Sequence, residues 1–147
     1  MKIGLKRLTP EAKIPAHSRE GDAGLDLWSD TSNKEGLPIV IPPQETVMIR
    51  TGVSMAIPTG WYGHICDRSG VAKNQGLHVL GGQIDSNYRG EICVLLCNTG
   101  NNPQVVKHQE RVAQMIIKRH ETVEFVEVDD LDETVRGENG FGSSGKD

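Results

Sequence analysis

The sequence predicts an all-β protein, and three observations support this fold class. Short β-rich runs recur along most of the chain, turn signals separate them, and only one short segment has helical character. The turn signals are Pro42-Pro43, Pro58-Thr59-Gly60 and the stretch from Asn98 to Pro103. This spacing is typical of a sandwich, jelly roll or barrel, and not of βαβ units, in which strands alternate with longer helices.

The expected strands follow from local composition, since each run is rich in β-branched or other apolar residues. In chain order they are Lys2–Leu8, Gly24–Trp28, Ile39–Ile41, Glu45–Ile49, Gly52–Ile57, Trp61–Cys66, Glu91–Asn98, Arg111–Lys118 and Thr122–Val128. Two stretches, Ile92–Cys97 and Met115–Ile117, are apolar at consecutive positions. We therefore expect those two strands to be covered on both faces.

One helix and one hairpin complete the expected elements. The helix spans Ser69–Asn74, with Ser69 as its N-cap and Gly76 as its end. The hairpin lies between Gly81 and Glu91, because Asp85 follows an apolar residue and precedes a turn of Ser86 and Asn87.

Size and charge narrow the possible functions. A chain of 147 residues forms one domain with a real core. Its aromatic content of 4% is low, which favours added subunit contacts in an oligomer. A net charge of −4 argues against direct binding to nucleic acid, which needs a surplus of clustered Lys and Arg. A nucleotide substrate stays possible, because one local basic site can operate in an acidic protein.

The cysteines and the lengths of the apolar segments indicate the cellular compartment. Cys66, Cys93 and Cys97 form neither an even disulfide set nor a CxxC pair, so we expect free, buried thiols in a reducing compartment. No segment is apolar for long enough to be a signal peptide or to span a membrane. Together these features predict a cytoplasmic protein.

The composition changes after Val128, where an acidic stretch leads into a Gly/Ser-rich end. We expect a β domain over residues 1–128 and a flexible C-terminal arm over residues 129–147. Most such tails are merely disordered ends. This one contains an Arg and a Phe five residues apart, and a simple linker has no physical need for either.

Several residues have possible chemistry, and each also has an ordinary structural explanation. The segment from Arg68 to Gly70 offers a forked donor, a hydroxyl and an open backbone N–H to phosphate oxygens, or it is a surface turn. Asp85 is either a general base for water or a turn former. Gln114 either satisfies buried backbone groups or reaches a ligand phosphate. Asp26 is either an inward functional carboxylate or a solvent-facing strand residue.

The order of these signals is more informative than any one of them. The segments AGLDLWS, DRSGVAKNQG, GGQIDSNYRGE, RVAQMI and RGENGFGSSG resemble, one after another, the motifs of the trimeric dUTPase family. The resemblance runs from Ala23 to Gly145. It implies a distorted jelly roll of the β-clip type, with one short helix and an extended C-terminal arm. It also implies a homotrimer with shared sites, in which the first, second and fourth motifs come from one chain, the third from a second and the arm from the third.

The resemblance implies hydrolysis of dUTP to dUMP and pyrophosphate with Mg²⁺, which keeps uracil out of DNA and supplies dUMP for thymidylate synthesis. Asp85 would activate the attacking water and bind the sugar 3′-OH. Tyr88 would stack under the deoxyribose and leave no room for a ribose 2′-OH. The backbone of the uracil-reading segment would pair with the base edge and reject thymine and cytosine. That segment is Gly82, Gln83 and Ile84.

The resemblance implies further roles at the triphosphate. Asp26 would reach Mg²⁺ only through a water of its shell, since magnesium keeps several waters and is held largely by substrate phosphates. From the arm, Phe141 would stack on uracil. The residues that would bind phosphate oxygens directly are Arg68, Ser69, Gly70 and Gln114. The arm residues that would close over the triphosphate are Arg136, Gly142, Ser143 and Ser144.

The sequence departs from the family pattern at Asp67, where proline is usual, and at Asn87, where a second acidic residue is usual. The carboxylate of Asp67 would partly neutralise the neighbouring Arg68. The closest alternative function is a dCTP deaminase, which shares the fold but needs a general-base Glu near the base amino group. A non-catalytic nucleotide-sensing or protein-binding trimer is the second alternative. Asp85 argues against both, and an additional regulatory partner is left open.

Overall fold

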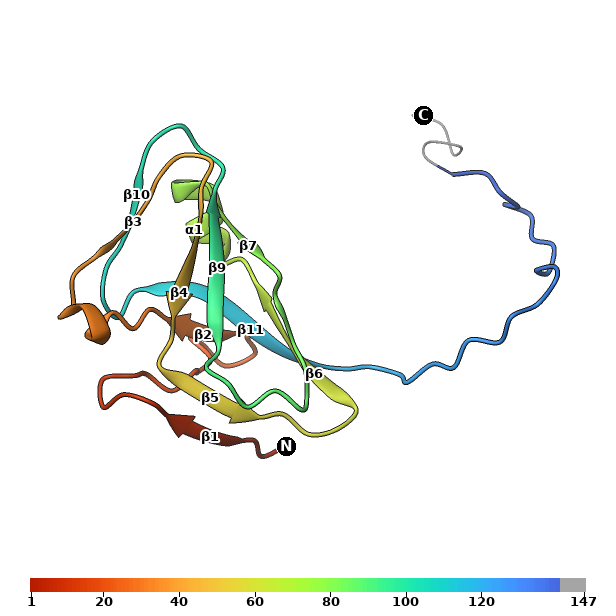
Figure 1. Cartoon of the computed structure of the whole chain (residues 1–147), viewed down its shortest axis with the longest axis horizontal. Coiled ribbons are helices and arrows are strands. Elements are labelled where there is room, and N and C mark those ends of the chain that lie inside the picture. The colour runs from red at the N-terminus through yellow and green to blue at the C-terminus, as the bar shows by residue number, and fades with distance from the viewer. Residues whose placement is uncertain (141–147) are drawn as a thin grey trace.

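The computed structural model describes residues 1–140 and confirms an all-β architecture with one short α-helix (Figure 1). The strands are β1 (Gly4–Arg7), β2 (Leu25–Trp28), β3 (Ile39–Ile41), β4 (Thr46–Arg50), β5 (Val53–Ala56), β6 (Trp61–Cys66), β7 (Leu77–Leu80), β8 (Gln83–Ile84), β9 (Cys93–Asn98), β10 (Gln104–Val106) and β11 (Arg111–Arg119). The helix α1 spans Ser69–Gln75, and a 3₁₀ turn, η1, spans Ser32–Lys34.

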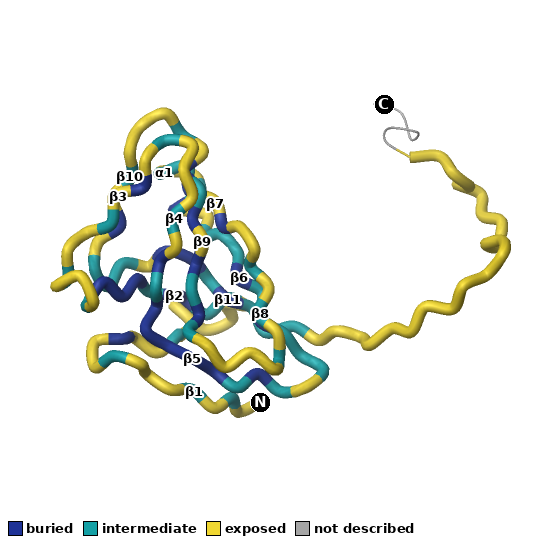
Figure 2. Tube along the Cα trace, viewed as in Figure 1, coloured by how far each residue is buried: buried dark blue, intermediate teal, exposed yellow. Residues whose placement is uncertain are grey.

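The strands form antiparallel sheets that pack around one core. The largest sheet has the order β2-β11-β6-β8, and a second has the order β4-β9-β7. The pairs β1-β5 and β10-β3 complete the body. Leu27 of β2, Ile49 of β4 and Leu96 of β9 are fully buried, so the core lies between the two larger sheets (Figure 2).

The strands predicted over Ile39–Ile41 and Trp61–Cys66 have those bounds in the structure, and most others agree within a few residues. Three strands were not predicted: β7, β8 and β10. Each has two to four residues, too short for a period of two to stand out. In β7, Leu77 and Val79 are nevertheless buried while His78 and Leu80 are exposed.

Two local predictions need correction. The helix N-cap is Arg68, which has an extended backbone, and Ser69 is already inside the helix; Gly76 does end it, in the left-handed region. The turn after Asp85 is confirmed, because the Tyr88 N–H donates to the Asp85 carbonyl at 3.1 Å. The chain does not fold back on β8 there, however. β8 pairs with β6, and the wide hairpin joins β7 to β9.

The predicted strand over Thr122–Val128 is wrong for the single chain, because β11 ends at Arg119 and residues 121–140 are exposed. Phe125 is 93% exposed, and the segment extends away from the body (Figures 1 and 2). A run of suitable composition forms a strand only where another strand completes its hydrogen bonds, and residues 1–120 supply none here. No helix among residues 1–140 is long and apolar enough to cross a membrane.

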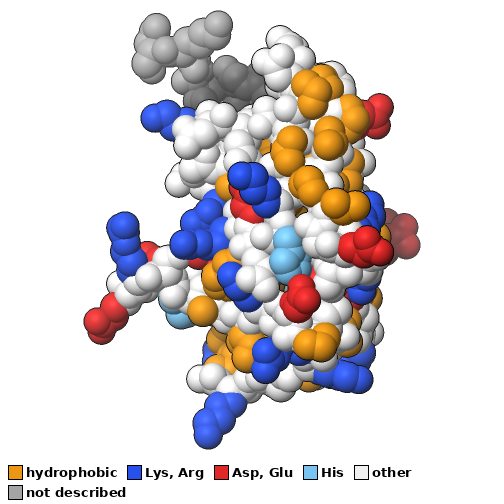
Figure 3. Space-filling model, turned by 90° about the vertical axis from the view of Figure 1, so that its left-hand side faces the viewer, with side chains coloured by type: hydrophobic (Ala, Val, Ile, Leu, Met, Phe, Trp, Pro, Cys, Tyr) orange, Lys and Arg blue, Asp and Glu red, His pale blue; other side chains and the backbone are white. Residues whose placement is uncertain are grey.

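Two outward faces remain apolar in the single chain. On the sheet β4-β9-β7, Met48, Leu95 and Leu80 are cross-strand neighbours and are 56%, 38% and 40% exposed. The expectation that β9 is covered on both faces is therefore wrong for one chain alone. Val40 and Val105, which are partners across the β3-β10 pair, are also exposed. Figure 3 views the molecule from the side on which β3 and β10 lie in Figure 1, and it shows hydrophobic side chains gathered at the upper right.

The cysteines are free, as predicted, but they are half-buried and not fully buried. Burial raises the pKa of the Cys66 and Cys93 thiols, which keeps both in the unreactive thiol form at neutral pH.

Candidate active site

Three segments that lie far apart in the sequence meet in the sheet β2-β11-β6. In its register Gln114 of β11 is opposite Asp26 of β2 on one side and Cys66 of β6 on the other. Arg68 follows two residues after Cys66, where the chain leaves β6 and enters α1. Antiparallel pairing therefore places a carboxylate, an amide and a guanidinium at one end of the sheet.

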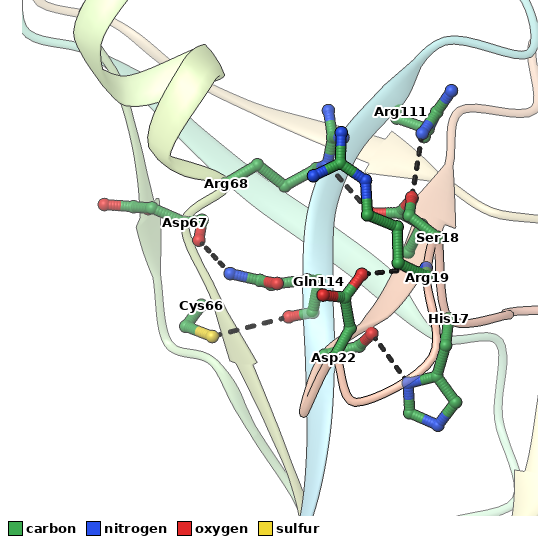
Figure 4. Close-up of polar contacts among 11 residues, drawn as sticks. His17, Ser18, Arg19, Asp22, Cys66, Asp67, Arg68, Arg111 and Gln114 are labelled. Atoms are coloured by element: carbon green, nitrogen blue, oxygen red, sulfur yellow. Dashed lines mark hydrogen bonds and ion pairs between the residues drawn. The ribbon is translucent and has the colours of Figure 1, made fainter.

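Asp26 is the buried centre of this group. Its side chain is inward, and the residue is only 5% exposed. Arg68 Nε donates to Oδ1 at 2.8 Å, while Ser18 Oγ and Arg111 donate to Oδ2 at 2.5 and 3.2 Å. Figure 4 shows Ser18, Arg68 and Arg111 close to one another. Burial by itself would raise the pKa of Asp26, but the Ser18 hydrogen bond and the two guanidinium groups outweigh it and lower that pKa. Of the two explanations of Asp26, the structure supports an inward carboxylate.

Gln114 does satisfy a backbone group, because its Nε2 donates to the Asp67 carbonyl at 2.8 Å. A second amide N–H stays available, since a primary amide has two. Gly24 is needed beside it: a Cβ at position 24 would overlap the Gln114 amide oxygen. The glycine therefore lets β2 and its preceding loop approach β11 closely.

These residues line an open cavity of about 830 Å³, a size compatible with a nucleotide. Its cations are Arg19, Arg68 and Arg111, and its acidic residues are Asp22 and Asp26. Asp26 is neutralised by its two guanidinium partners, so the cavity has donors suited to an anion. The full lining is Ala16, His17, Ser18, Arg19, Asp22, Ala23, Gly24, Asp26, Trp28, Arg68, Ser69, Gly70, Arg111, Gln114 and Ile116.

A second, smaller cavity of about 270 Å³ lies at the hairpin between β7 and β9. Asp85 and Tyr88 line it together with residues of β4, β8 and β9. The Tyr88 hydroxyl donates to the Glu91 carbonyl at 3.0 Å, and a Cβ at Gly90 would overlap the tyrosine ring. The Tyr88 ring is therefore held against the backbone of the turn that follows it, at Gly90 and Glu91. The full lining is Met48, Gly81, Gln83, Ile84, Asp85, Tyr88, Glu91, Cys93 and Leu95.

The hairpin is fastened to the body at both ends. At one end the Ile65 N–H donates to the Gly82 carbonyl at 2.7 Å, and a Cβ at Gly82 would overlap the Ile65 carbonyl oxygen. At the other end, the Glu91 carboxylate accepts from Arg50 Nε and from the Gly52 N–H, both at 2.8 Å. Asp85 is exposed on this anchored frame.

The residues predicted for one site thus fall into separate groups. Asp26, Gln114 and the segment from Arg68 to Gly70 line the larger cavity, while Asp85, Tyr88, Gln83 and Ile84 belong to the hairpin. Among residues 1–140, none lines both cavities. Gly82 faces a third hollow, beside Tyr62 and His64.

The predicted arm residues stand apart from both groups. Arg136 lies in the exposed arm, where its Nε donates to the Asn139 carbonyl. The remaining predicted arm residues lie outside the described part of the chain: Phe141, Gly142, Ser143 and Ser144.

The sequence reasoning missed Ser18, Arg19 and Arg111, which complete the larger cavity. Arg111 stands at the start of the motif RVAQMI, so its position beside Gln114 was the available signal. Ser18 and Arg19 lie in an irregular loop, where no periodicity indicates that they fold over β2.

The expected neutralisation of Arg68 by Asp67 is wrong. Arg68 pairs with Asp26, and the Asp67 carboxylate points away from it toward β7 (Figure 4). Adjacent side chains on extended backbone project to opposite sides, which explains the difference.

Among residues 1–140, no cluster of three or more His, Cys, Asp or Glu side chains could hold a metal ion by itself. Both oxygens of Asp26 already accept hydrogen bonds from cationic or hydroxyl groups. The described residues therefore do not form a cage that would hold a metal ion by protein ligands alone.

Comparison with known proteins is consistent over almost the whole chain. The model of the dUTPase family matches residues 10–145. The deoxyuridine 5′-triphosphate nucleotidohydrolase of Corynebacterium efficiens is 44% identical over 147 residues, covering 98% of this chain and 78% of that protein.

Among solved structures, the dUTPase of Staphylococcus bacteriophage 80alpha with dUpNHpp has a TM-score of 0.84 at 29% identity, covering 98% of both chains. A mutant dUTPase of phage phi11 of S. aureus, described with a structural Mg(II) ion, has a TM-score of 0.80 at 22% identity and covers 90% of this chain and 100% of its own. These likenesses agree with the predicted jelly-roll-like fold.

Proposed function

This chain belongs to the dUTPase family and is a dUTP diphosphatase, and on that premise we propose that Asp85 activates the attacking water in sites shared between the chains of a homotrimer. The observation that supports the shared site is the separation of the two cavities. The groups that can donate to phosphate oxygens line the larger cavity, and Asp85 and Tyr88 line the smaller one. No residue in the described part of the chain lines both. A second copy of the chain would place its hairpin over the larger cavity and complete the site.

The reaction is hydrolysis between the α- and β-phosphates of dUTP. The carboxylate of Asp85 accepts a proton from a water molecule as the water oxygen attacks the α-phosphorus. The bond from that phosphorus to the bridging oxygen breaks, and pyrophosphate leaves with the bond electrons, so the products are dUMP and pyrophosphate. Asp85 is well placed for this role because it is exposed on an anchored hairpin next to Tyr88.

The triphosphate would lie in the larger cavity. Arg68 uses Nε on Asp26, which leaves its terminal nitrogens free to donate to phosphate oxygens. The first-turn N–H groups of α1 at Ser69 and Gly70 have no partner inside the helix, so they can donate as well. The free N–H of the Gln114 amide completes this set. These donors would align the α-phosphate for in-line attack by the water.

Magnesium fits this arrangement as a partner of the substrate phosphates. When bound, it supplies charge neutralisation to the triphosphate. Asp26 would contact a water of its shell, and the Ser18 hydrogen bond and the two guanidinium groups lower the pKa of Asp26 and so keep its carboxylate ionised.

Base and sugar selection would occur at the hairpin. The backbone from Gly82 to Ile84 would pair with uracil, and the ring of Tyr88 would exclude a ribose 2′-OH. The ring is suited to this because its hydroxyl is tied to the Glu91 carbonyl, which limits its freedom to move aside. Such selectivity keeps uracil out of DNA and supplies dUMP for thymidylate synthesis.

Trimer contacts and the arm would complete the enzyme. The exposed apolar face formed by Met48, Leu80 and Leu95 borders the hairpin cavity, and subunit contact would bury it. The arm over residues 129–147 would close over the site of a neighbouring subunit, with Arg136 on the phosphates and Phe141 on uracil. Exposure of residues 121–140 in the single chain supports an arm that is free to reach a neighbour.

The test is pyrophosphate release measured separately with dUTP, dCTP, dTTP and UTP, each with Mg²⁺ and with a chelator. We expect turnover of dUTP alone at low substrate concentration, and loss of that turnover with the chelator. Ammonia release from dCTP would instead indicate a deaminase. Equal turnover of dUTP and UTP would contradict the sugar selection assigned to Tyr88.

A further inference from the structure

We propose that Asp67 is a positioning residue for triphosphate binding, which fastens the end of β6 to the edge of β7 and thereby fixes both Arg68 and Gln114. The inference rests on the proposed roles of Arg68 and Gln114 as phosphate ligands. Asp67 itself does not line the larger cavity, so it would act through its neighbours and not by touching the substrate.

The Asp67 carboxylate accepts a backbone hydrogen bond at the edge of β7, where a neighbouring strand would otherwise accept it. In the sheet β4-β9-β7, β7 pairs with β9 on one side, and no other strand within residues 1–140 pairs with its other side. On its open side, the Val79 N–H donates to Asp67 Oδ1 at 2.7 Å. An unpaired N–H on a half-buried strand costs free energy, so this hydrogen bond stabilises the carboxylate in its observed position.

His78 holds the other oxygen of the same carboxylate. Its Nδ1 lies 2.7 Å from Asp67 Oδ2, and since an ionised carboxylate only accepts, the imidazole donates. Consecutive residues of β7 therefore engage both oxygens. Two contacts from one rigid strand fix the orientation of the carboxylate as well as its position.

The backbone of Asp67 passes this constraint to the site. Its carbonyl accepts from Gln114 Nε2 at 2.8 Å, and the next residue along the chain is Arg68. Asp67 is thus attached to β7 by its side chain and to β11 by its backbone, immediately before the phosphate-binding segment begins. If the side-chain attachment is removed, the peptide between residues 67 and 68 keeps its contact with Gln114 but is no longer fixed to β7, so both phosphate ligands are held less precisely.

The test compares affinity for a triphosphate with affinity for a monophosphate in the full-length protein. Calorimetry would measure the Kd of dUpNHpp and of dUMP for the wild type, Asp67→Ala, His78→Ala and the double variant. For Asp67→Ala we expect the dUpNHpp Kd to rise about tenfold, an effect of the size of one weakened charge-assisted hydrogen bond, and the dUMP Kd to change less than about twofold. The double variant should equal Asp67→Ala, because His78 acts only through Asp67.

A conservative variant separates positioning from general damage. Asp67→Asn keeps an oxygen that accepts from the Val79 N–H, so it should recover most of the triphosphate affinity. His120→Gln is the matched control, since this exposed histidine follows the last residue of β11 and its Nδ1 lies beside the Glu121 carbonyl. The ratio of the two Kd values is insensitive to the fraction of folded protein, so a partly unfolded variant remains informative.

Arg68→Ala distinguishes failure of this inference from failure of the proposed function. If Arg68→Ala weakens dUpNHpp selectively and Asp67→Ala does not, Asp67 is not a positioning residue. If Arg68→Ala weakens dUpNHpp and dUMP equally, the proposed phosphate role of Arg68 is itself wrong. Equal losses for both ligands in Asp67→Ala, with a selective loss in Arg68→Ala, would also overturn the positioning role.

Discussion

Replacing Asp26 by Asn tests the cluster of charged residues that lines the larger cavity. The buried carboxylate accepts hydrogen bonds from Arg68, Arg111 and Ser18, and an amide of the same shape has one acceptor oxygen instead of two. At least one guanidinium bond is therefore lost, and the other guanidinium loses its counter-charge.

The size of the effect follows from these contacts. A hydrogen bond to a charged group contributes about 1.5–3 kcal/mol. Solvent reduces this value, because the side chains of Arg68 and Arg111 are 28% and 47% exposed. We expect Asp26→Asn to lower the free energy of unfolding at pH 7 by about 2 kcal/mol, which for a chain of this length lowers Tm by roughly 6–8 °C.

The effect should depend on pH in a defined direction. The pKa of Asp26 in the folded chain is below its ordinary value of 3.8. The stabilisation is therefore fully present above about pH 4 and is lost as the pH falls through the lower, folded pKa. The Tm difference between wild type and Asp26→Asn should be constant from neutral pH down to about pH 5 and should shrink below the ordinary pKa.

The assay is thermal unfolding followed by circular dichroism at one protein concentration, across that pH range. Asp22→Asn is the matched control, because Asp22 lies in the same region but is exposed and accepts from a backbone N–H. We expect the control to change stability by less than about 0.5 kcal/mol. A Tm for Asp26→Asn equal to that of the control, or a Tm difference unchanged at pH 3, would refute the reasoning.

Three further substitutions test other parts of the account. Asp85→Asn should lower kcat by about 10²–10⁴ while dUpNHpp affinity survives, and near-normal turnover would remove Asp85 as the base. Tyr88→Ala should reduce the preference for dUTP over UTP in kcat/KM by roughly tenfold, and an unchanged ratio would show that the ring does not read the sugar. Gly24→Ala should destabilise the fold by about 1–3 kcal/mol in urea, because its Cβ meets the Gln114 amide; an unchanged midpoint would mean that the amide moves aside freely.

Some strands could be predicted from the sequence because local turn signals bound them. Proline pairs and Pro-Thr-Gly flank Ile39–Ile41 and Trp61–Cys66, and both have the predicted bounds. Thr122–Val128 has equally suitable composition but forms no strand in the single chain. Strand formation there depends on a partner at long range, which local composition does not reveal.

The site could be predicted only in part for the same reason. The order of motifs identified Asp26, Gln114 and Arg68, but their meeting depends on the register of β2, β11 and β6. Proximity in sequence was misleading at Asp67, which adjoins Arg68 yet contacts β7. The contacts of Ser18 with Asp26 are set by a loop whose path has no signal in the sequence.

The shared active site can be tested by combining two inactive chains. One chain has Asp85→Asn and an intact arm, and the other has Asp85 and ends at Val135, before Arg136. Each homotrimer should be nearly inactive. After the two are mixed in equal amounts, unfolded and refolded, every mixed trimer should hold one site with a sound hairpin and a sound arm. Random assembly then predicts recovery of roughly a quarter of wild-type activity. No recovery, with mixed trimers identified by native mass spectrometry, would contradict the exchange of arms between subunits.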